Sequence, residues 1–402
     1  MCGIFGFNWT DENLAAKLNN VLGHRGPNAK GYYEDKNITL GHRRLSIVDL
    51  SPKGKQPMTN ETEDVWLTYN GEIFNFEEIK KTLQKEGHVF ASETDSEILV
   101  HGYEEYGENI LNKLNGQFAF CIYDKHKNKV LIARDQAGIL PIYYYCNNDK
   151  FIFGSELKVL IQSQNFDKKI DETALKHYFM YGYTPRGKSI LKNVEKLIPG
   201  SYLIYDLEKK EITKQQKYWE YDFDKNKQDN TENVQEKILE TLEDGVKKRL
   251  MADVPIGAFL SGGVDSSTIV ALMKRHKEDV QTFSISFDYS DFDESQYSNQ
   301  IAKKFNTNHT IIDFDFEDVK ELLESLPKYY DEPFADHSSI PTFLVSKVAK
   351  ENVTVCLSGD GADELFGGYE KYRLAVLVNK IKKIPFSPQI TTALSKVITS
   401  KK

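Results

Sequence analysis

The segment Leu260-Ser261-Gly262-Gly263-Val264-Asp265-Ser266-Ser267 joins a short apolar run, 255–260, to a helical pattern over 266–275. Two adjacent glycines let backbone N–H groups approach an anion with no Cβ atom in the way. The helix that follows offers its positive N-terminal end to a phosphate. The serine hydroxyls can donate hydrogen bonds, and Asp265 can hold a divalent cation. No lysine follows the glycines, so this is not a Walker loop. We predict a nucleotide-binding strand–turn–helix unit.

Strands and helices alternate on both sides of this loop, which predicts a parallel α/β sheet. After a helix over 231–251 and the strand 255–260, we expect strands at 280–287, 309–313 and 353–357, and helices at 266–275, 294–305, 318–326 and 340–350. The last strand runs into Ser358-Gly359-Asp360-Gly361-Ala362-Asp363-Glu364. Ligands of open α/β sheets bind at the carboxyl ends of the strands, and three carboxylates so close together favour a bound cation. We predict that Asp265 and Asp363 hold Mg²⁺.

The first half of the chain has a different rhythm, in which apolar runs alternate with turn residues. Strands are expected at 38–40, 65–69, 118–123, 129–133 and 151–153, with helices at 76–86 and 96–106. Strands with a few inserted helices indicate α+β layers. The polar, charge-rich stretch 220–230 is the expected linker between the two halves.

The chain begins Met1-Cys2-Gly3-Ile4-Phe5-Gly6. Initiator methionine is usually removed when a small residue follows, so we expect Cys2 to become the first residue. It would then carry a thiol and a free α-amine whose ordinary pKa is about 7.7–8.0. Activation of a terminal nucleophile by its own amine is a known catalytic device.

Composition excludes several classes. With 52 basic and 60 acidic residues the formal net charge is −8, which argues against a nucleic-acid partner. The four cysteines show no C-x-x-C spacing, which argues against a zinc site and a disulfide scaffold. The sequence shows neither a signal-peptide pattern nor 18 consecutive apolar residues. We expect a cytoplasmic enzyme without a membrane partner; a homodimer is allowed.

These features together resemble the glutamine-dependent asparagine synthetase family. The resemblance runs from Cys2 to about Tyr372 and rests on blocks in one order: Cys2-Gly3-Ile4, His24-Arg25-Gly26-Pro27, Arg44-Leu45-Ser46-Ile47-Val48-Asp49, Asn70-Gly71-Glu72-Ile73-Phe74-Asn75, Asp95-Ser96-Glu97, the two loops described above, and Asp331-Glu332-Pro333-Phe334. It implies an αββα N-terminal-nucleophile glutaminase domain (2–219), the linker (220–230) and an ATP-pyrophosphatase-type synthetase domain (231–402).

The family implies a role for each residue in the first domain. Cys2 attacks the side-chain amide of glutamine, and the Asn70 side chain and the Gly71 N–H stabilise the oxyanion. Arg44 clamps the α-carboxylate of glutamine. Glu72 and Asp95 hold the α-ammonium group. The segment Leu45, Ser46, Ile47 and Val48 completes the glutamine site.

In the second domain, the resemblance implies that MgATP adenylates the side chain of aspartate and that ammonia, arriving through an internal passage, attacks the acyl-adenylate. AMP and pyrophosphate are released. The implied ATP contacts are Leu260, Ser261, Gly262, Gly263, Asp265, Ser266, Ser267, Ile285, Ser358, Gly359 and Asp360.

Two features depart from the family pattern. Asn28 stands where an aspartate is usual, and the chain ends at Lys402, whereas family members commonly continue and supply a lysine near the acceptor carboxylate. We therefore expect a shortened synthetase domain. Besides an asparagine synthetase, the sequence leaves open an amidotransferase acting on another carboxylate, such as a sugar acid of a surface polysaccharide, a glutaminase with an incomplete second domain, and a non-catalytic sensing module.

Overall fold

The computed structural model describes residues 1–147, 149–164, 166–222, 233–287, 293–314 and 316–382. The chain forms two compact units, one of Met1–Ile256 with Phe314–Val355 and one of Gly257–Asp313 with Cys356–Lys402. Most of the expected linker, 223–230, and the end of the expected second domain, 383–402, lie outside the described residues.

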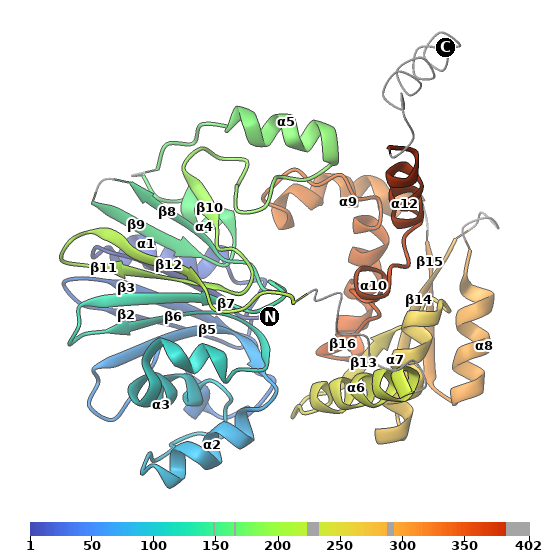
Figure 1. Ribbon diagram of the computed structural model, residues 1–402, viewed down its shortest axis with the longest axis horizontal. Helices are drawn as coiled ribbons and strands as arrows, with labels where there is room; N and C mark the ends of the chain where they lie inside the picture. The colour runs from blue at the N-terminus through green and yellow to red at the C-terminus, as the bar shows by residue number, and fades with distance from the viewer. Residues whose placement is uncertain (148, 165, 223–232, 288–292, 315, 383–402) are drawn as a thin grey trace. The chain divides into compact units, whose positions relative to one another are not determined.

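The first unit contains two six-stranded sheets (Figure 1). One has the strand order β10-β8-β9-β1-β3-β2, and its recorded pairs are antiparallel. In chain order its strands are β1 (Gly3–Phe7), β2 (Ala29–Glu34), β3 (Thr39–Arg44), β8 (Tyr143–Asn147), β9 (Lys150–Gly154) and β10 (Val194–Lys196). The strand that begins one residue after Cys2 is therefore central in its sheet, which fixes the backbone beside that cysteine.

The second sheet has the order β12-β11-β7-β6-β5-β4 and is also antiparallel. Its strands are β4 (Met58–Thr59), β5 (Val65–Ile73), β6 (Gly116–Asp124), β7 (Lys129–Arg134), β11 (Ser201–Asp206) and β12 (Glu211–Lys217). Alternate residues of β6 serve two different cores: Phe118, Phe120 and Ile122 enter one, and Ala119, Cys121 and Tyr123 enter the other. Because both faces of this strand are buried, its sequence is a continuous apolar run.

Three apolar cores show the layering of the unit. One lies between the two sheets, one between the second sheet and the helices α2 (Phe76–Lys85) and α3 (Glu97–Tyr106), and one between the first sheet and the helices α1 (Glu12–Val21) and α4 (Leu157–Ile161). The order helix–sheet–sheet–helix follows. This confirms the predicted α+β class and the αββα sandwich.

The second unit is built on a four-stranded sheet of order β15-β14-β13-β16. Its elements are β13 (Ile256–Phe259), α7 (Val264–His276), β14 (Gln281–Phe287), α8 (Ser295–Phe305), β15 (Asn308–Phe314), β16 (Val355–Leu357), α11 (Ala362–Phe366) and α12 (Glu370–Lys382). The pairing of β13 with β14 is parallel, as predicted for an α/β domain. In chain order β13 is followed by β14 and β15, which lie on one side of β13 in the sheet. The later strand β16 lies on the other side of β13. The strand order therefore reverses beside β13, and ligands of open α/β sheets bind at such a point.

Two 3₁₀ turns and four helices of the described residues remain. They are the 3₁₀ turns η1 (Pro52–Gly54) and η2 (Gly107–Asn112) and the helices α5 (Glu172–Tyr181), α6 (Val234–Arg249), α9 (Phe316–Tyr329) and α10 (Ser339–Asn352). The contacts of α6, α9 and α10 group them with the first unit. Within the described residues, no helix is both long and apolar enough to cross a bilayer.

Candidate functional site: a glutamine-type pocket and a nucleotide-type loop

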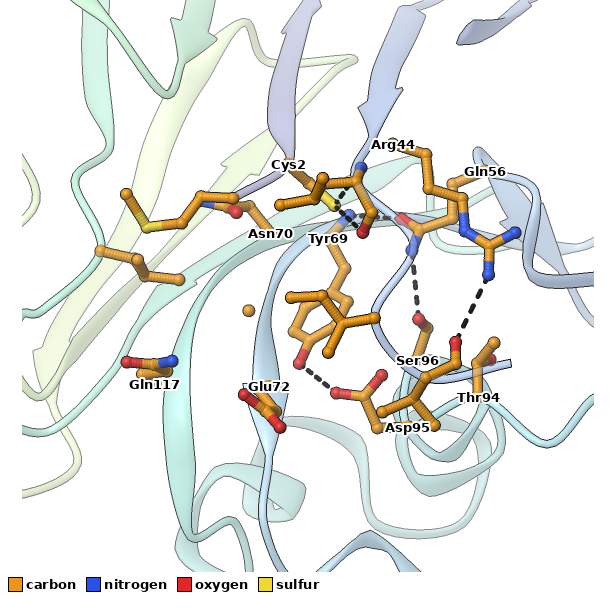
Figure 2. Close-up of a pocket in the computed structure, with 16 residues that line it drawn as sticks. Cys2, Arg44, Gln56, Tyr69, Asn70, Glu72, Thr94, Asp95, Ser96 and Gln117 are labelled. Atoms are coloured by element: carbon orange, nitrogen blue, oxygen red, sulfur yellow. Dashed lines mark hydrogen bonds between the residues drawn. The ribbon is translucent and has the colours of Figure 1, made fainter. Parts of the chain in front are cut away.

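A pocket in the first unit lies beside the thiol of Cys2 (Figure 2). The backbone N–H of Leu45 donates to Cys2 Sγ at 3.4 Å, and Sγ lies 3.6 Å from the Leu45 carbonyl oxygen. The Cys2 carbonyl accepts from Arg25 Nε at 2.8 Å, and Arg25 in turn pairs with Glu156 at 2.8 Å. These contacts hold the cysteine backbone and direct its sulfur toward the pocket.

The protonation of the chain start is shifted by its surroundings. Burial raises the pKa of the Cys2 thiol, although the hydrogen bond from Leu45 acts in the opposite direction. Desolvation lowers the pKa of the Met1 α-ammonium group to about 6. The Met1 amine is therefore largely neutral at pH 7, and a neutral amine can accept the proton of a thiol.

Asn70 and Gly71 lie in β5 on the wall of the same pocket. Both polar atoms of the Asn70 side chain are buried without a hydrogen-bond partner among the described residues. An unpaired buried amide is costly, so it marks a place where a ligand atom would supply the missing bond. A Cβ atom at Gly71 would lie 2.5 Å from the Gln117 carbonyl oxygen, and therefore only glycine fits there.

Two carboxylates face the pocket from β5 and from the segment before α3. Asp95 accepts from the Tyr69 hydroxyl at 2.5 Å and from the Ile73 N–H at 2.9 Å, and burial raises its pKa. Desolvation, with the charge of Asp95, raises the pKa of Glu72 to about 8, while Arg249 acts to lower it. A ligand cation would relieve the repulsion between these carboxylates, and the pocket is thus suited to an ammonium group.

Arg44 lies at the end of β3, and its guanidinium shapes the loop that follows. It donates to the carbonyl oxygens of Ser51 at 2.7 Å, Asp49 at 2.5 Å and Val48 at 3.5 Å. Guanidinium has five N–H donors, so these three bonds leave capacity for a ligand carboxylate. Asp253 also holds this loop, since its N–H donates to Ile47 and its carboxylate accepts from the Asp49 N–H.

The pocket collects most of the residues that the sequence predicted for it. Its lining includes Cys2, Arg44, Leu45, Ile47, Val48, Asn70, Gly71, Glu72 and Asp95. Ser46 is not part of the lining; its backbone N–H instead donates to the Asn28 side chain at 3.0 Å. The amide oxygen of Asn28 is the acceptor in this bond, and the carboxylate usual at that position could accept in the same way.

Further residues of the lining were not singled out by the sequence analysis: Met1, Gln56, Tyr69, Thr94, Ser96, Gln117 and Leu140. Gln56 accepts from the Tyr69 N–H at 2.7 Å and donates to Ser96 at 3.1 Å, so it links two walls of the pocket. Ser96 lies in a sequence block that carried the family resemblance, and so does Arg25, which holds the Cys2 carbonyl. Membership of these blocks is the sequence feature that could have identified both residues.

In the second unit, the Ser261–Ser267 loop forms the turn from β13 into α7. Gly262 has a φ of +88°, and a Cβ atom there would lie 2.6 Å from the Ser298 nitrogen. The Ser261 hydroxyl accepts from the Gly263 N–H at 3.2 Å and pairs with the Ser266 hydroxyl at 3.1 Å. The Ser267 hydroxyl is buried without a hydrogen-bond partner among the described residues. The loop is thus held in shape at the positive end of a 13-residue helix.

The loop after β16 reaches the same helix start. A Cβ atom at Gly359 would lie 2.8 Å from Asp265 Cβ and 2.8 Å from the Ser266 nitrogen. Ser358 donates to Asp360 at 2.9 Å. The two predicted loops therefore meet, as expected where the strand order reverses. Leu260 is buried at the end of β13, and Ile285 lies on β14, two residues beyond the Phe283 carbonyl that accepts from the Leu260 N–H.

The predicted metal ligands lie in this second unit. Asp265 is exposed in the first turn of α7, and Asp363 is half-buried in α11. Neither belongs to a close group of three potential ligands among the described residues. Mg²⁺ is usually held by one or two carboxylates together with phosphate oxygens and water, so a pair of carboxylates fits this ion.

The two parts of the chain match two protein families. Residues 1–219 match the model described as a glutamine amidotransferase domain, and residues 237–400 match the model described as asparagine synthase. A protein of Methanocaldococcus jannaschii, provisionally named a glutamine-hydrolysing asparagine synthetase, is 40% identical over 412 residues, which cover 96% of this chain and 79% of that protein. Glutamine-hydrolysing asparagine synthetase 1 of Bacillus subtilis is 36% identical over 96% of this chain, which spans 61% of that enzyme.

Solved structures give more distant matches. The glutamine phosphoribosylpyrophosphate amidotransferase of Bacillus subtilis, complexed with ADP and GMP, is 14% identical with a TM-score of 0.40, covering 80% of this chain and 70% of its own. An NH3-dependent NAD synthetase of Campylobacter jejuni is 20% identical with a TM-score of 0.25, covering 33% of this chain and 60% of its own.

Proposed function

Because this chain belongs to the family of glutamine-hydrolysing asparagine synthetases, we propose that it transfers the amide nitrogen of glutamine to the side-chain carboxylate of aspartate at the expense of ATP. The products are asparagine, glutamate, AMP and pyrophosphate. In this proposal residues 2–219 form the glutaminase domain, 220–230 the linker and 231–402 the synthetase domain. Glutamine, aspartate and ATP are the partners, and we place the reaction in the cytoplasm.

In the first half-reaction Cys2 is the nucleophile. After removal of Met1, its own α-amine accepts the thiol proton, and the sulfur attacks the amide carbon of glutamine. The tetrahedral intermediate collapses, the C–N bond breaks, and the amine returns the proton to the departing ammonia. Water then hydrolyses the thioester to glutamate. The raised pKa of the Cys2 thiol means that the proton must be taken up locally, because little thiolate exists beforehand.

The unpaired amide of Asn70 is the observation that carries this proposal. Its nitrogen is buried beside the nucleophile with no protein acceptor among the described residues. A donor that is desolvated in advance stabilises an oxyanion better than a donor in water. We assign the Asn70 side chain and the Gly71 N–H as the two donors to the oxyanion.

The rest of the pocket selects the amino-acid end of glutamine. We propose that Arg44 binds the α-carboxylate, and that Glu72 and Asp95 bind the α-ammonium group. We propose that Leu45, Ile47 and Val48 form the pocket edge around the substrate, and that Ser46, which bonds to Asn28, holds the backbone of this segment in place. The raised pKa of Glu72 supports its assignment, because a bound cation would stabilise the ionised carboxylate.

In the second half-reaction, we propose that ATP binds where the two loops of the second unit meet. Its contacts are Leu260, Ser261, Gly262, Gly263, Asp265, Ser266, Ser267, Ile285, Ser358, Gly359 and Asp360. The carboxylate of aspartate attacks the α-phosphorus, pyrophosphate leaves, and ammonia then displaces AMP from the acyl-adenylate. Asp265 and Asp363 are the residues that we propose for Mg²⁺, which when bound neutralises phosphate charge.

The proposal is tested by incubating the protein with glutamine, ATP and Mg²⁺ in the presence of a panel of carboxylic acids, and measuring glutamate and pyrophosphate. Pyrophosphate released only with aspartate supports the proposal. Release with another acid alone would reassign the acceptor. Glutamate without pyrophosphate would reduce the function to a glutaminase, and the absence of both products would contradict catalysis altogether.

A further inference from the structure

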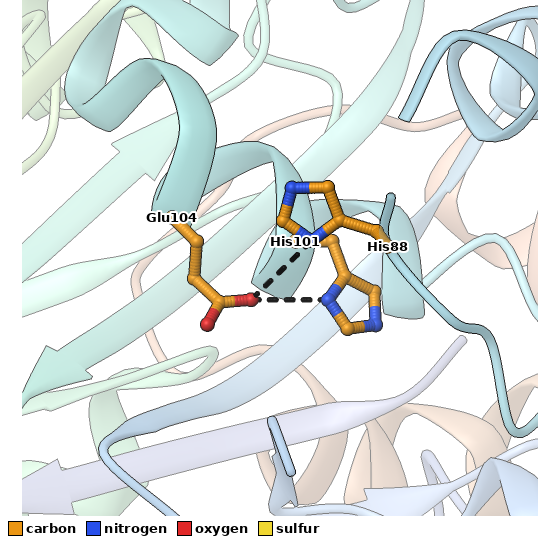
Figure 3. Close-up of side chains that lie close together, drawn as sticks. All are labelled: His88, His101 and Glu104. Carbon is orange, nitrogen blue, oxygen red and sulfur yellow. Dashed lines mark hydrogen bonds and ion pairs between the residues drawn. The ribbon is translucent and has the colours of Figure 1, made fainter. Parts of the chain in front are cut away.

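A cluster of metal-ligating side chains lies in the first unit, on the helix layer outside the second sheet. His101 and Glu104 lie one turn apart on α3, and His88 lies in the segment between α2 and α3 (Figure 3). One nitrogen of each histidine and one oxygen of Glu104 all lie within 4.8 Å of one another. None of the three residues lines the pocket beside Cys2. We call this group the His–Glu cluster.

Glu104 is the meeting point of the His–Glu cluster. Its Oε2 atom lies 3.0 Å from Nδ1 of His101 and 3.9 Å from Nδ1 of His88, as the dashed lines in Figure 3 mark. The two imidazole rings have their centres 5.1 Å apart. His101 is 2% exposed, and the exposed fractions of the His88 and Glu104 side chains are 17% and 27%. Three ligand atoms thus converge at a place that solvent reaches from one side.

The second nitrogen of each histidine and the second carboxylate oxygen of Glu104 lie near other polar groups. His101 Nε2 lies 3.6 Å from a Glu97 oxygen, and His88 Nε2 lies 3.6 Å from a Glu105 oxygen. Glu104 Oε1 accepts from Asn60 at 2.7 Å. Metal-binding histidines almost always direct their second nitrogen to a carboxylate, a carbonyl or water, which sets the tautomer and the ring orientation. Each histidine has a carboxylate oxygen 3.6 Å from its second nitrogen, close enough to take this role after a small shift.

The carboxylate behind His101 is itself held rigidly. Glu97 accepts from the N–H groups of Ala91 and Ser92, each at 2.7 Å, and from the Ser92 hydroxyl at 2.5 Å. Glu97 faces Nε2 of His101, so Nδ1, which lies 3.0 Å from Glu104 Oε2, is the nitrogen of His101 directed into the cluster. A bound cation would take the place of the proton between Nδ1 and Glu104.

We propose that His88, His101 and Glu104 bind one Zn²⁺ ion, with water as the fourth ligand. Two imidazoles and one carboxylate are a known zinc ligand set, and Zn²⁺ binds these atoms at about 2.0–2.2 Å. The ligand atoms must therefore approach one another by on the order of 1 Å, which a rotation of the His88 and Glu104 side chains would supply. The cysteine spacing that argued against zinc does not bear on a site of this kind.

Isothermal titration of the full-length, metal-free protein with ZnCl₂, after removal of any affinity tag, tests the proposal. We expect one saturable site per chain in the wild type. Loss of a residue that only supports a metal ligand lowers metal affinity by about 10- to 100-fold. His88→Ala and Glu104→Gln, which remove ligands themselves, should each weaken Zn²⁺ binding by at least about tenfold. Co²⁺ should give the visible absorption of a tetrahedral complex in the wild type and lose it in both variants. Zn²⁺ should also raise the unfolding temperature of the wild type, but not that of His88→Ala or Glu104→Gln.

A matched control is His126→Ala, since His126 is 78% exposed and pairs with Asp64 rather than with the His–Glu cluster. This variant should bind Zn²⁺ as the wild type does. All variants should retain glutaminase activity, which shows that they are folded. Protons compete with the metal for the histidine nitrogens, so binding should weaken as pH falls. Absence of saturable binding, or equal affinity in His88→Ala, would overturn the proposal.

Discussion

Glu72 is the pocket residue whose charge should depend most visibly on pH. Its pKa of about 8 in the free protein means that it is largely protonated at pH 7. In the proposed site the α-ammonium group of glutamine binds the ionised carboxylate of Glu72, so the affinity for glutamine should fall about tenfold for each pH unit below 8. Asp95, Tyr69 and Arg249 are the other titratable groups around it.

This dependence is best measured as the dissociation constant of glutamine by calorimetry in the Cys2→Ala variant, which cannot turn over and lacks the Cys2 thiol. Adding Glu72→Gln should weaken binding at pH 8 and above and should abolish most of the pH dependence. If the double variant kept the same slope, another group, with Asp95 the first to consider, would be responsible.

Asn70 should affect the chemical step more than binding. In the proposed mechanism the Asn70 amide donates to the oxyanion and not to the amino-acid end of glutamine. Asn70→Ala should therefore lower kcat for glutamate release by about 10²–10³ with a smaller change in KM. Pyrophosphate release driven by ammonia should be unchanged. A kcat within about threefold of the wild type would be inconsistent with the loss of an oxyanion donor.

Sequence motifs identified most of the residues that line the pocket, but not all of them. Arg44, Asn70 and Asp95 lie in recognisable blocks, whereas Gln117 reaches the pocket through the pairing of β5 with β6. Gln56 reaches it through the hydrogen bonds of its side chain with Tyr69 and Ser96. Ser46 shows the opposite case: it lies inside a predicted block, yet it contacts Asn28 instead of lining the pocket. A linear motif cannot tell which way each side chain of a loop points.

Among the elements of the second unit, the turn after β16 has a strict steric requirement at Gly359. A methyl group at Gly359 would lie 2.8 Å from Asp265 Cβ, a distance that real contacts do not show. Gly359→Ala should therefore displace the start of α7 and lower ATP-dependent pyrophosphate release by at least about tenfold, equivalent to about 1.4 kcal/mol. Glutaminase activity should stay near that of the wild type.

Gly245→Ala is a suitable control for this glycine test. A Cβ atom at Gly245, within α6, meets only Arg249 Nη1, at 3.6 Å. Alanine favours a helix interior over glycine by about 1 kcal/mol, so this variant should be as active and at least as stable. Equal pyrophosphate release by Gly359→Ala and Gly245→Ala would mean that the two loops do not need to meet.

Strands and helices with strong periodicity were predicted correctly, and the weaker ones were missed. The apolar runs of β5, β6 and β7 and the alternation of the second unit are confirmed. The helix α1 and the strands β11 and β12 were not predicted. β12 reads Glu-Ile-Thr-Lys-Gln-Gln-Lys, is mostly exposed and lies at the sheet edge, where side-chain hydrophobicity carries little signal.

The order of helix and sheet layers in the first unit is a property of the whole fold rather than of any single element. The sequence alone indicated α+β layers, and the αββα order came from the family resemblance. Three separate cores confirm that order, because each sheet buries both of its faces. The order of strands within each sheet could not be predicted, since it depends on long-range pairings such as that of β1 with β9.

The proposed assembly of two half-reactions in one chain predicts that they can be separated at Cys2. Removing the sulfur removes the proposed nucleophile, whose hydrogen bonds are to Leu45 and Arg25 of the first unit, and leaves the sequence of the two loops of the second unit unchanged. The most direct measurement is pyrophosphate release by Cys2→Ala in the presence of aspartate and ATP, with either glutamine or ammonia as the nitrogen donor. We predict that release with glutamine is lost and that release with ammonia persists. Continued release with glutamine in this variant would contradict the assignment of Cys2 as the nucleophile that supplies the nitrogen.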